Sequence, residues 1–240
     1  MKKKILGTAL VTGAAKRLGQ AVALYLADQG FSIALHYNQS KSEAMKIAQL
    51  LYKKGKPCEL FSCDLSDVKQ TSRLIPQVHK AFPNFNLLIN SASVFIPNEL
   101  GAIDLRLFEQ HWNINFKAPY VLSCEFARLC KAGQIINFID TNVVKYKTQY
   151  ADYLLTKKAL AEFTKMAAVA WGPRIRVNGI SPGMILAPVN QKDNRQARAK
   201  KVPLQSVGHS QFILDTVQFL LTNTYVTGQI IAVDGGEQLV

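Results

Sequence analysis

The sequence alternates short apolar runs with amphipathic stretches along almost its whole length. Runs such as GTALV, FSIALHY, NLLIN and GQIINF are nearly free of charge, and stretches with apolar residues at helical spacing separate them. Strands that are apolar on both faces are typical of a parallel sheet covered by helices on both sides. The pattern therefore predicts an α/β fold with a doubly wound parallel sheet.

The alternation continues without a linker or an internal repeat, so residues 1–240 are expected to form one domain. Residues 184–210 lose the periodicity, and we predict a mobile loop beside the substrate there. Its most basic part, KDNRQARAKK (192–201), could form a basic helix face, but a solvated mobile segment is favoured.

The N-terminal segment, MKKKILGTALVTG, has the basic start of a secretory signal. Gly7, Thr8, Thr12 and Gly13 interrupt its apolar run, so a strand that enters a glycine turn is the better interpretation. No run reaches the ~20 apolar residues of a membrane span, and we expect no membrane partner.

The cysteines, Cys58, Cys63, Cys124 and Cys130, form no CxxC pair, and the four histidines are scattered. The spacing indicates neither a zinc site nor a disulfide framework. Reduced cysteines in a cytoplasmic protein are expected.

The net charge of +13 raises nucleic acid as a partner. The basic residues, however, are spread over many segments without interleaved aromatic residues, so we expect no nucleic-acid partner. A general positive field would instead attract an anionic cofactor.

The first apolar run ends in the turn TGAAKRLG (12–19). Gly13 permits a tight turn, and Gly19 permits close packing at the start of the next helix, whose free N–H groups attract phosphate. Arg17 stands where a dinucleotide fingerprint has its middle glycine, so an ordinary glycine turn stays an alternative.

The second apolar run ends in LHYNQS, with His36, Tyr37, Asn38 and Ser40 but no acid. An acid at this place would hold the ribose of NAD and repel a 2′-phosphate. Its absence, next to Arg17, predicts NADPH or NADP⁺ as the cofactor. After the third run, Asp64 suits either an adenine amino group or a helix cap.

Tyr153 and Lys157 lie one helical turn apart, and Asp140 precedes the tyrosine by thirteen residues. A free tyrosine has a pKa near ~10, and an adjacent ammonium is expected to lower it. Such a pair beside a nicotinamide can act as the proton donor in a hydride reduction.

These motifs together resemble the short-chain dehydrogenase/reductase family over nearly the whole chain. The other markers are NSAS (90–93), Asn115 in NINFKAPY, RVNGISPG (176–183) and VDGG (233–236). The resemblance implies a Rossmann-type domain with a seven-stranded parallel sheet and usually a homotetramer. It makes Asn115 the holder of a water near Lys157, and it implies further cofactor contacts from Leu18, Leu65, Asn90, Ser91, Ala92, Ser93, Pro182, Gly183 and Met184.

The departures from the family pattern are similar to those of the pteridine reductases and the bacterial dihydromonapterin reductases. Arg17 replaces a glycine, Ser91 and Ser93 stand within the usual NNAG, and Asp140 replaces a serine. In this subgroup the residue at Phe95 stacks on the pterin, and Ser93 and Arg17 would reach the substrate and the phosphates.

Asp140 also carries a chemical argument. An ionised carboxylate only accepts hydrogen bonds, so it would repel a ketone oxygen but not a C=N bond. It can also orient the phenol of Tyr153 and bind N–H groups of a pterin. The alternative is a capping or salt-bridged aspartate at a position where the family serine is lost.

We therefore expect an NADPH-dependent reductase that converts a 7,8-dihydropterin, such as dihydromonapterin or dihydrobiopterin, to its tetrahydro form. Dihydrofolate is a further candidate substrate. The first alternative is a carbonyl reductase, for example of a 3-oxoacyl thioester. A non-enzymatic NADP sensor is the second, although it would be expected to lack Tyr153 or Lys157.

Overall fold

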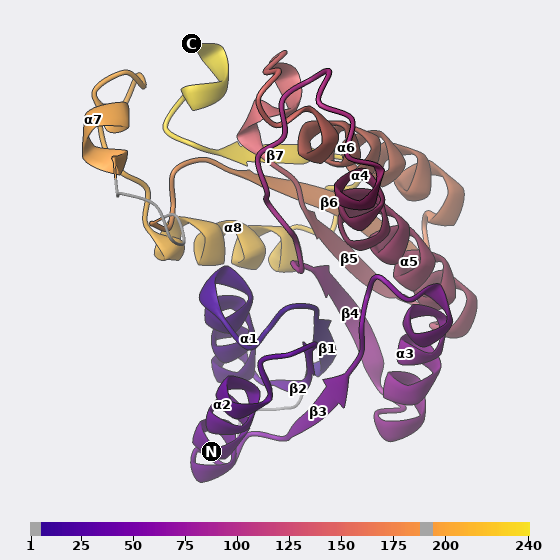
Figure 1. Cartoon of the computed structure of the whole chain (residues 1–240). Coiled ribbons are helices and arrows are strands. Elements are labelled where there is room, and N and C mark those ends of the chain that lie inside the picture. Colours follow the sequence, from indigo (N-terminus) through magenta and orange to yellow (C-terminus); the bar gives the residue numbers. More distant parts are fainter. Residues whose placement is uncertain (1–5, 188–193) are drawn as a thin grey trace.

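The computed structural model describes residues 6–187 and 194–240 and is built around one seven-stranded parallel sheet. The strands follow the order β3-β2-β1-β4-β5-β6-β7 (Figure 1). They are β1 (Gly7–Val11), β2 (Phe31–Tyr37), β3 (Cys58–Ser62), β4 (Phe85–Asn90), β5 (Gly133–Phe138), β6 (Ile175–Pro182) and β7 (Ile230–Val233). The predicted fold class is confirmed.

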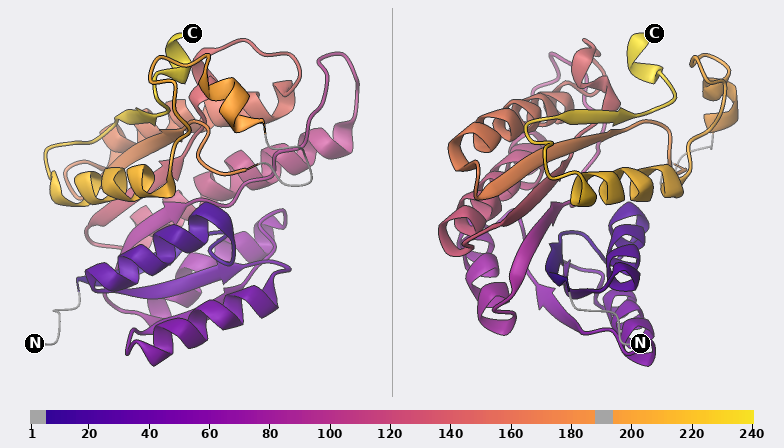
Figure 2. Two further views of the ribbon diagram at one scale, coloured as in Figure 1. Left: turned by 90° about the vertical axis from the view of Figure 1, so that its left-hand side faces the viewer. Right: turned by 180° about the vertical axis from the view of Figure 1, so that it is seen from behind.

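Helices cover both faces of the sheet (Figure 2). Side chains of α1 (Arg17–Gln29), α2 (Lys41–Lys53) and α8 (Ser210–Thr222) pack in the cluster that contains Ala9 and Val11. Those of α3 (Val68–Ala81), α5 (Ala118–Leu129) and α6 (Ala151–Trp171) pack with Leu10 on the opposite face. Successive strand residues point to opposite faces, so a strand between two helical layers must be apolar throughout.

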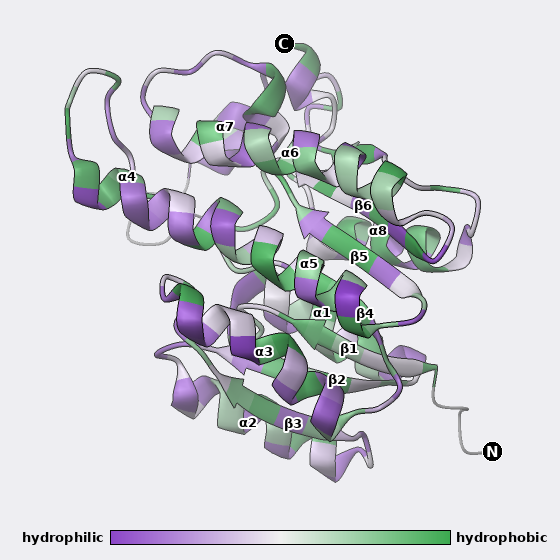
Figure 3. Cartoon of the chain, turned by 90° about the vertical axis from the view of Figure 1, so that its right-hand side faces the viewer, coloured by the Kyte–Doolittle hydropathy of each residue, from purple (hydrophilic) through white to green (hydrophobic). Residues whose placement is uncertain are grey.

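Hydropathy follows the same layers. Figure 3 shows mainly hydrophobic strands inside the molecule and helices that alternate hydrophilic and hydrophobic colours along their outer surface. No helix within residues 6–187 and 194–240 has the length and apolar character that crossing a membrane requires.

The helices begin and end at residues with a local reason. Gly30 ends α1 in the left-handed conformation at φ 108°, which suits glycine. Asp67 begins α3, where its side chain accepts hydrogen bonds from the amides of Lys69 and Gln70.

The expected helical zone at about 105–131 is interrupted. It consists of α4 (Leu105–Trp112), a π-helical turn at Asn113–Lys117, and α5. Such single π-helical turns are frequent at functional sites.

The segment after β6 is partly packed. Met184, Ala199 and Val202 form a small buried cluster that holds the short helix α7 (Arg195–Ala199). A short helix therefore occupies part of the basic run that was expected to be solvated. The mobility predicted for residues 184–210 falls in part on residues 188–193, which lie outside the described residues.

Strand order reverses direction between β1 and β4. In open parallel sheets the crevice beyond the strand ends at such a reversal is the usual ligand site. The loops that carry the predicted motifs all leave the carboxyl ends of strands, so this topology positions the site.

Candidate active site

A cleft of about 1000 Å³ lies beyond the carboxyl ends of the strands. Its size is at the upper end of ligand sites, which suits a large cofactor together with a small substrate. The predicted residues that it brings together are Gly13, Arg17, Leu18, Gly19, His36, Asn38, Asp64, Leu65, Ser91, Ala92, Ser93, Phe95, Asp140, Tyr153, Pro182, Gly183 and Met184. Lys157 lines a smaller adjoining cavity, together with Asp140 and Tyr153.

Four further predicted residues line neither of these cavities. Tyr37 is buried at the end of β2, and Ser40 stands at the start of α2 without a capping hydrogen bond from its side chain. Asn90 turns into the interior, where its amide donates to Ser123 Oγ at 3.2 Å and to Asn137 Oδ1 at 2.8 Å. Asn90 therefore links β4 to β5 and α5. The fourth residue is Asn115, in the π-helical turn.

The glycine turn after β1 is packed too closely for a side chain at either of its glycines. Gly13 has φ +65°, and a Cβ there would lie 3.0 Å from Ala92 Cα. A Cβ on Gly19 would lie 2.5 Å from the carbonyl oxygen of Gly13. Thr12 Oγ1 accepts from the amides of Ser91 and Ala92, both at 3.0 Å, so the turns after β1 and β4 are joined.

His36 supports this turn from beneath. It is 2% exposed; its Nδ1 accepts from the amide of Gly13 at 3.0 Å, and its Nε2 lies 3.0 Å from the carbonyl oxygen of Cys63. Burial lowers the pKa of His36 to about 4, so the ring is neutral and Nε2 carries the proton. His36 was predicted as a cofactor contact and lines the cleft; its two ring nitrogens are engaged within the protein, and the contact stays a prediction.

The turn itself contains two cations, Lys16 and Arg17. Arg17 has a left-handed backbone conformation, with φ 55°. Its Nη2 donates to the carbonyl oxygen of Ala187 at 2.8 Å, and Arg17 lines the cleft. Lys16 forms an ion pair with Glu43 at 2.9 Å. The acid near the end of β2 is therefore Glu43, in the first turn of α2. Glu43 pairs with Lys16 and not with Arg17, so Arg17 can bind a phosphate.

Asp64 faces the cleft after β3. Its Oδ1 accepts from the amide and the hydroxyl of Ser66 at 2.9 and 2.8 Å. The helix cap that was the alternative for Asp64 is provided by Asp67, so a contact to the cofactor is still open to Asp64.

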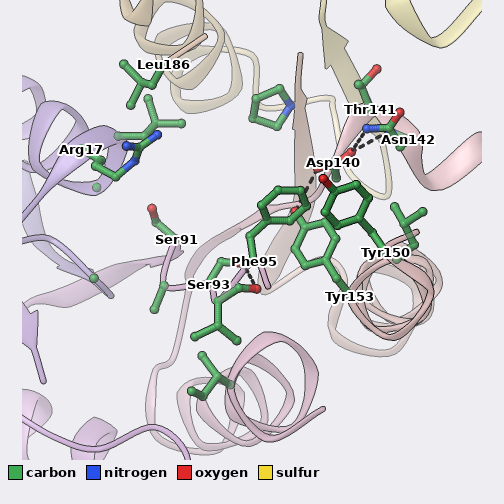
Figure 4. Close-up of a pocket in the computed structure, with 18 of the residues that line it drawn as sticks. Arg17, Ser91, Ser93, Phe95, Asp140, Thr141, Asn142, Tyr150, Tyr153 and Leu186 are labelled. Carbon is green, nitrogen blue, oxygen red and sulfur yellow. Dashed lines mark hydrogen bonds between the residues drawn. The ribbon is translucent and has the colours of Figure 1, made fainter. Parts of the chain in front are cut away.

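Asp140 divides its two carboxylate oxygens between two partners (Figure 4). Oδ2 accepts from the hydroxyl of Tyr153 at 2.9 Å. Oδ1 accepts from the amide and the side chain of Asn142 at 2.7 and 2.8 Å, which caps a 3₁₀ turn at Thr141–Val144. Asp140 thus both caps this turn and bonds the phenol, and its role in catalysis stays a prediction.

Lys157 lies behind the phenol. Its Nζ is buried, donates to the carbonyl oxygen of Phe138 at 2.8 Å, and lies 5.8 Å from the centre of the Tyr153 ring. Burial lowers the pKa of Lys157 to about 8, against the opposing effect of Asp140.

The expected acidification of Tyr153 is not found in this arrangement. Burial and the charge of Asp140 raise the pKa of Tyr153 well above its ordinary value, and a hydrogen bond with Ser93 opposes them weakly. Burial is the largest cause, and Asp140 adds to it, because the Tyr153 hydroxyl donates to Asp140 Oδ2 at 2.9 Å whereas the ammonium of Lys157 donates to a carbonyl oxygen. The phenol is therefore held neutral, with its proton in place.

Phe95 lies in front of these groups and is 53% exposed. Its ring stacks on Tyr150, with centroids 4.6 Å apart, and meets the edge of Tyr153 at 4.7 Å. Sequence reasoning missed Tyr150, although it stands three residues before Tyr153 and so one turn away at the start of α6. A flat substrate bound here would pack against the rings of Phe95 and Tyr150.

Asn115 sits in the π-helical turn and is fully buried. Its Oδ1 accepts from Ser93 Oγ at 3.0 Å and from the amide of Val94 at 2.8 Å, and its Nδ2 donates to the carbonyl of Val94 at 2.9 Å. Asn115 was predicted to hold a water near Lys157. Its three side-chain hydrogen bonds fix the loop that carries Ser93 and Phe95, and the water site stays a prediction.

The far end of the cleft contains residues that sequence reasoning did not single out. Lys147, Arg195, Arg198 and Glu237 line it, from three segments far apart in the chain. No local pattern marks them, whereas Asn142 had a signal, because Asp-x-Asn favours a turn closed by the aspartate side chain.

Comparison with known proteins agrees with this geometry. A family model described as Enoyl-(Acyl carrier protein) reductase matches residues 13–238. The 3-oxoacyl-[acyl-carrier-protein] reductase FabG of Staphylococcus aureus (strain Mu50) is 29% identical over 97% of this chain and 98% of its own length.

Solved structures give a second line of similarity. FolM Alternative dihydrofolate reductase 1 from Brucella suis, in complex with NADP, has a TM-score of 0.93 and 33% identity over 100% of this chain and 97% of that one. The FolM protein from Brucella canis, also complexed with NADP, has a TM-score of 0.92 and 34% identity over 98% and 95% of the two chains. The chain is a member of the short-chain dehydrogenase/reductase family.

Proposed function

We propose that this protein is an NADPH-dependent reductase of pterins that converts a 7,8-dihydropterin to the tetrahydro form. The observation that carries the proposal is the hydrogen bond between Tyr153 and the acceptor-only carboxylate of Asp140. The similarity to two FolM dihydrofolate reductases supports it.

The cleft fits a dinucleotide. Gly13 and Gly19 line the cleft in the turn at the start of α1, where free backbone N–H groups can bind a pyrophosphate. Arg17 provides a cation at the cleft, and Asn38 stands where an NAD-selective fold has an acid. When bound, NADPH supplies a hydride to the carbon of a C=N bond.

The residues around the phenol supply the proton. As the substrate carbon gains the hydride, the electron pair of the C=N bond moves to nitrogen, which takes the proton of Tyr153. Asp140 holds the hydroxyl until then, and the ammonium of Lys157 offsets the charge left on the phenolate. Water then returns a proton to Tyr153. Positioned proton transfer of this kind contributes roughly 10²–10⁴-fold in rate.

Asp140 also selects the substrate. A ketone oxygen gains negative charge in the transition state, and a carboxylate at that place would destabilise it. A ring C=N bond develops its charge on a nitrogen that is being protonated, and pterin N–H groups can donate to the carboxylate. Phe95 and Tyr150 offer an aromatic surface for the flat ring.

The second candidate is a carbonyl reductase acting on a 3-oxoacyl thioester. The similarity to the FabG reductases of Staphylococcus favours it. Asp140 argues against it, because carbonyl reduction calls for a donor where this chain has an acceptor.

The remaining expectations belong to the same proposal. A homotetramer and a cytoplasmic location rest on the family resemblance and on the reduced cysteines. The proposed partners are a pterin or folate substrate, without nucleic acid.

A substrate panel tests the proposal. Turnover of NADPH is followed with dihydromonapterin, dihydrobiopterin, dihydrofolate and an acetoacetyl thioester. The proposal expects a kcat/KM at least ~100-fold higher for a dihydropterin than for the thioester, given the size of acid–base effects. Turnover of the thioester alone would establish the second candidate instead.

A further inference from the structure

The short turn that presents Asp140 depends on contacts from outside the catalytic residues. Asp140 begins the 3₁₀ turn at Thr141–Val144 and accepts from the amide and the side chain of Asn142, so its carboxylate keeps its place only if the turn does. A 3₁₀ turn of this length has few hydrogen bonds of its own, and their geometry is poorer than in an α-helix. Contacts with the rest of the protein must therefore fix it.

The end of the chain supplies such contacts. The hydroxyl of Thr141, a residue that is 2% exposed, donates to Oδ2 of Asp234, which directly follows β7. Lys145 ends the 3₁₀ turn, and its Nζ donates to the carbonyl oxygen of Glu237 at 2.6 Å. The last turn of the chain, Glu237–Leu239, therefore lies beside the turn that follows Asp140 (Figure 1).

Asp234 is itself held in place by the backbone around it. Its Oδ2 also accepts from the amide of Gln238 at 2.8 Å, and its Oδ1 accepts from the amide of Gly236 at 2.9 Å. Hydrogen bonds to an ionised acceptor are stronger than neutral ones, so these donors give the carboxylate a defined position. Asp234 lines neither the cleft nor the adjoining cavity, so an effect of Asp234 on the reaction has to pass through Thr141.

We infer that Asp234 is a positioning residue: by accepting the hydroxyl of Thr141, it keeps the neighbouring Asp140 on the phenol of Tyr153. The path is short, because Thr141 follows Asp140 directly and Asp140 Oδ2 accepts from Tyr153 at 2.9 Å (Figure 4). Asp234 thereby couples the last strand of the sheet to the proton donor. The inference rests on the proposed function, in which Asp140 directs the proton of Tyr153.

The test removes the hydroxyl with Thr141→Val and keeps it with Thr141→Ser. The matched control is Thr71→Val, because Thr71 is 1% exposed and its hydroxyl donates to the carbonyl oxygen of Asp67, outside both cavities. Each variant is made in the wild type and in Asp140→Ala, and kcat is measured with dihydromonapterin at saturating NADPH.

In the wild-type background, Thr141→Val should lower kcat by about tenfold, within the ~10²-fold that a misplaced group can cost, and should leave the KM for NADPH unchanged. In Asp140→Ala the same change should alter kcat by less than about twofold, because the residue through which it acts is already missing. Thr141→Ser should restore most of kcat, and Thr71→Val should keep it.

Two kinetic results would overturn the positioning role. One is an unchanged kcat in Thr141→Val, and the other is an equal fall of kcat in both backgrounds, which would show a general effect on the structure. If Thr141→Val fails to fold, Asp234→Ala, which removes the acceptor instead of the donor, takes its place in the same comparison.

A measurement without substrate separates this inference from the proposed function. Crystal structures of the wild type and Thr141→Val should show the hydrogen bond between Tyr153 and Asp140 in the wild type and its loss in the variant. A bond that Thr141→Val retains would overturn the positioning role. Failure of the wild type to reduce any dihydropterin would contradict the proposed function, and the two crystal structures would still decide the role of Asp234.

Discussion

Two side chains at the centre of the site, Tyr153 and Lys157, have pKa values that burial shifts in opposite directions. Burial and Asp140 raise the pKa of Tyr153, so the phenol keeps its proton throughout the physiological range. Burial lowers the pKa of Lys157 to about 8. Of the two, Lys157 is therefore the group whose charge changes first as the pH rises.

This order predicts the alkaline limb of the pH profile. The value of kcat/KM reports groups of the free enzyme, so it should fall above pH about 8 as Lys157 loses its proton. The arginine of Lys157→Arg stays charged over the whole pH range of the assay, because a guanidinium has a pKa above ~12. The variant should be slower but should lack this limb. A limb that stays near pH 8 in Lys157→Arg would assign it to another group.

Arg17 carries a prediction about coenzyme choice. If its guanidinium binds the 2′-phosphate, Arg17→Gln should lower the NADPH-to-NADH ratio of kcat/KM by roughly 10- to 100-fold, the worth of a charge-assisted hydrogen bond. Arg73→Gln, an exposed position on α3, is the control. An unchanged ratio in Arg17→Gln would remove Arg17 from the phosphate site.

At the scale of elements, His36 joins three strands. It stands on β2 and links the turn after β1, at Gly13, to the end of β3, at Cys63. Both links require the neutral ring with the proton on Nε2, so protonation of Nδ1 would break the bond to Gly13.

His36 therefore predicts a loss of stability in acid. Its pKa is 6.5 when unfolded and about 4 when folded, so the unfolded state binds the proton first as the pH falls. The free energy of unfolding should decline from pH 6.5 down to about 4, by about 3 kcal/mol from this residue. Urea denaturation of the wild type, His36→Gln and the control His79→Gln measures it. An equal acid loss in His36→Gln would contradict the assignment.

The π-helical turn explains why the loop after β4 is ordered. Asn115 makes three hydrogen bonds to Ser93 and Val94 from a fully buried position. A regular helix through residues 105–131 would place its side chains differently from this turn, which points Asn115 at the loop.

Asn115→Ala should leave the amide and carbonyl of Val94 without partners. We expect a loss of about 1–3 kcal/mol in the free energy of unfolding, together with a higher KM for the pterin, because Phe95 follows Val94 directly. The control is Asn113→Ala, whose side chain accepts from Lys117 at the surface. If Asn113→Ala and Asn115→Ala behave alike, Asn115 has no special role in the loop.

At the scale of the whole molecule, the sequence predicts the sheet well because apolar periodicity and glycine positions are local signals. The position of the cleft beyond the carboxyl ends of the strands follows from such signals and from general rules of α/β folds, whereas the strand order is seen only in the structure. The turn at Gly13 and the pair Tyr153 and Lys157 could be located in the same way.

The sequence does not predict interactions that only folding brings together. Lys16 pairs with Glu43 of the next helix. Glu237, near the end of the chain, pairs with Arg198 of α7. The pKa of Tyr153 was expected to fall, because the spacing of Lys157 is visible in the sequence whereas the distance to Asp140 is not. The direction of the shift depends on how deeply folding buries the phenol and on which charged partner then bonds it.

The central claim is that Asp140 makes the site one for a C=N bond. The most direct measurement is the ratio of kcat/KM for dihydromonapterin to that for an acetoacetyl thioester, in the wild type and in Asp140→Ser. The account predicts a ratio well above one in the wild type and a fall of about 100-fold or more in the variant, whose hydroxyl can donate to a carbonyl oxygen. A ratio that Asp140→Ser leaves unchanged would contradict the claim.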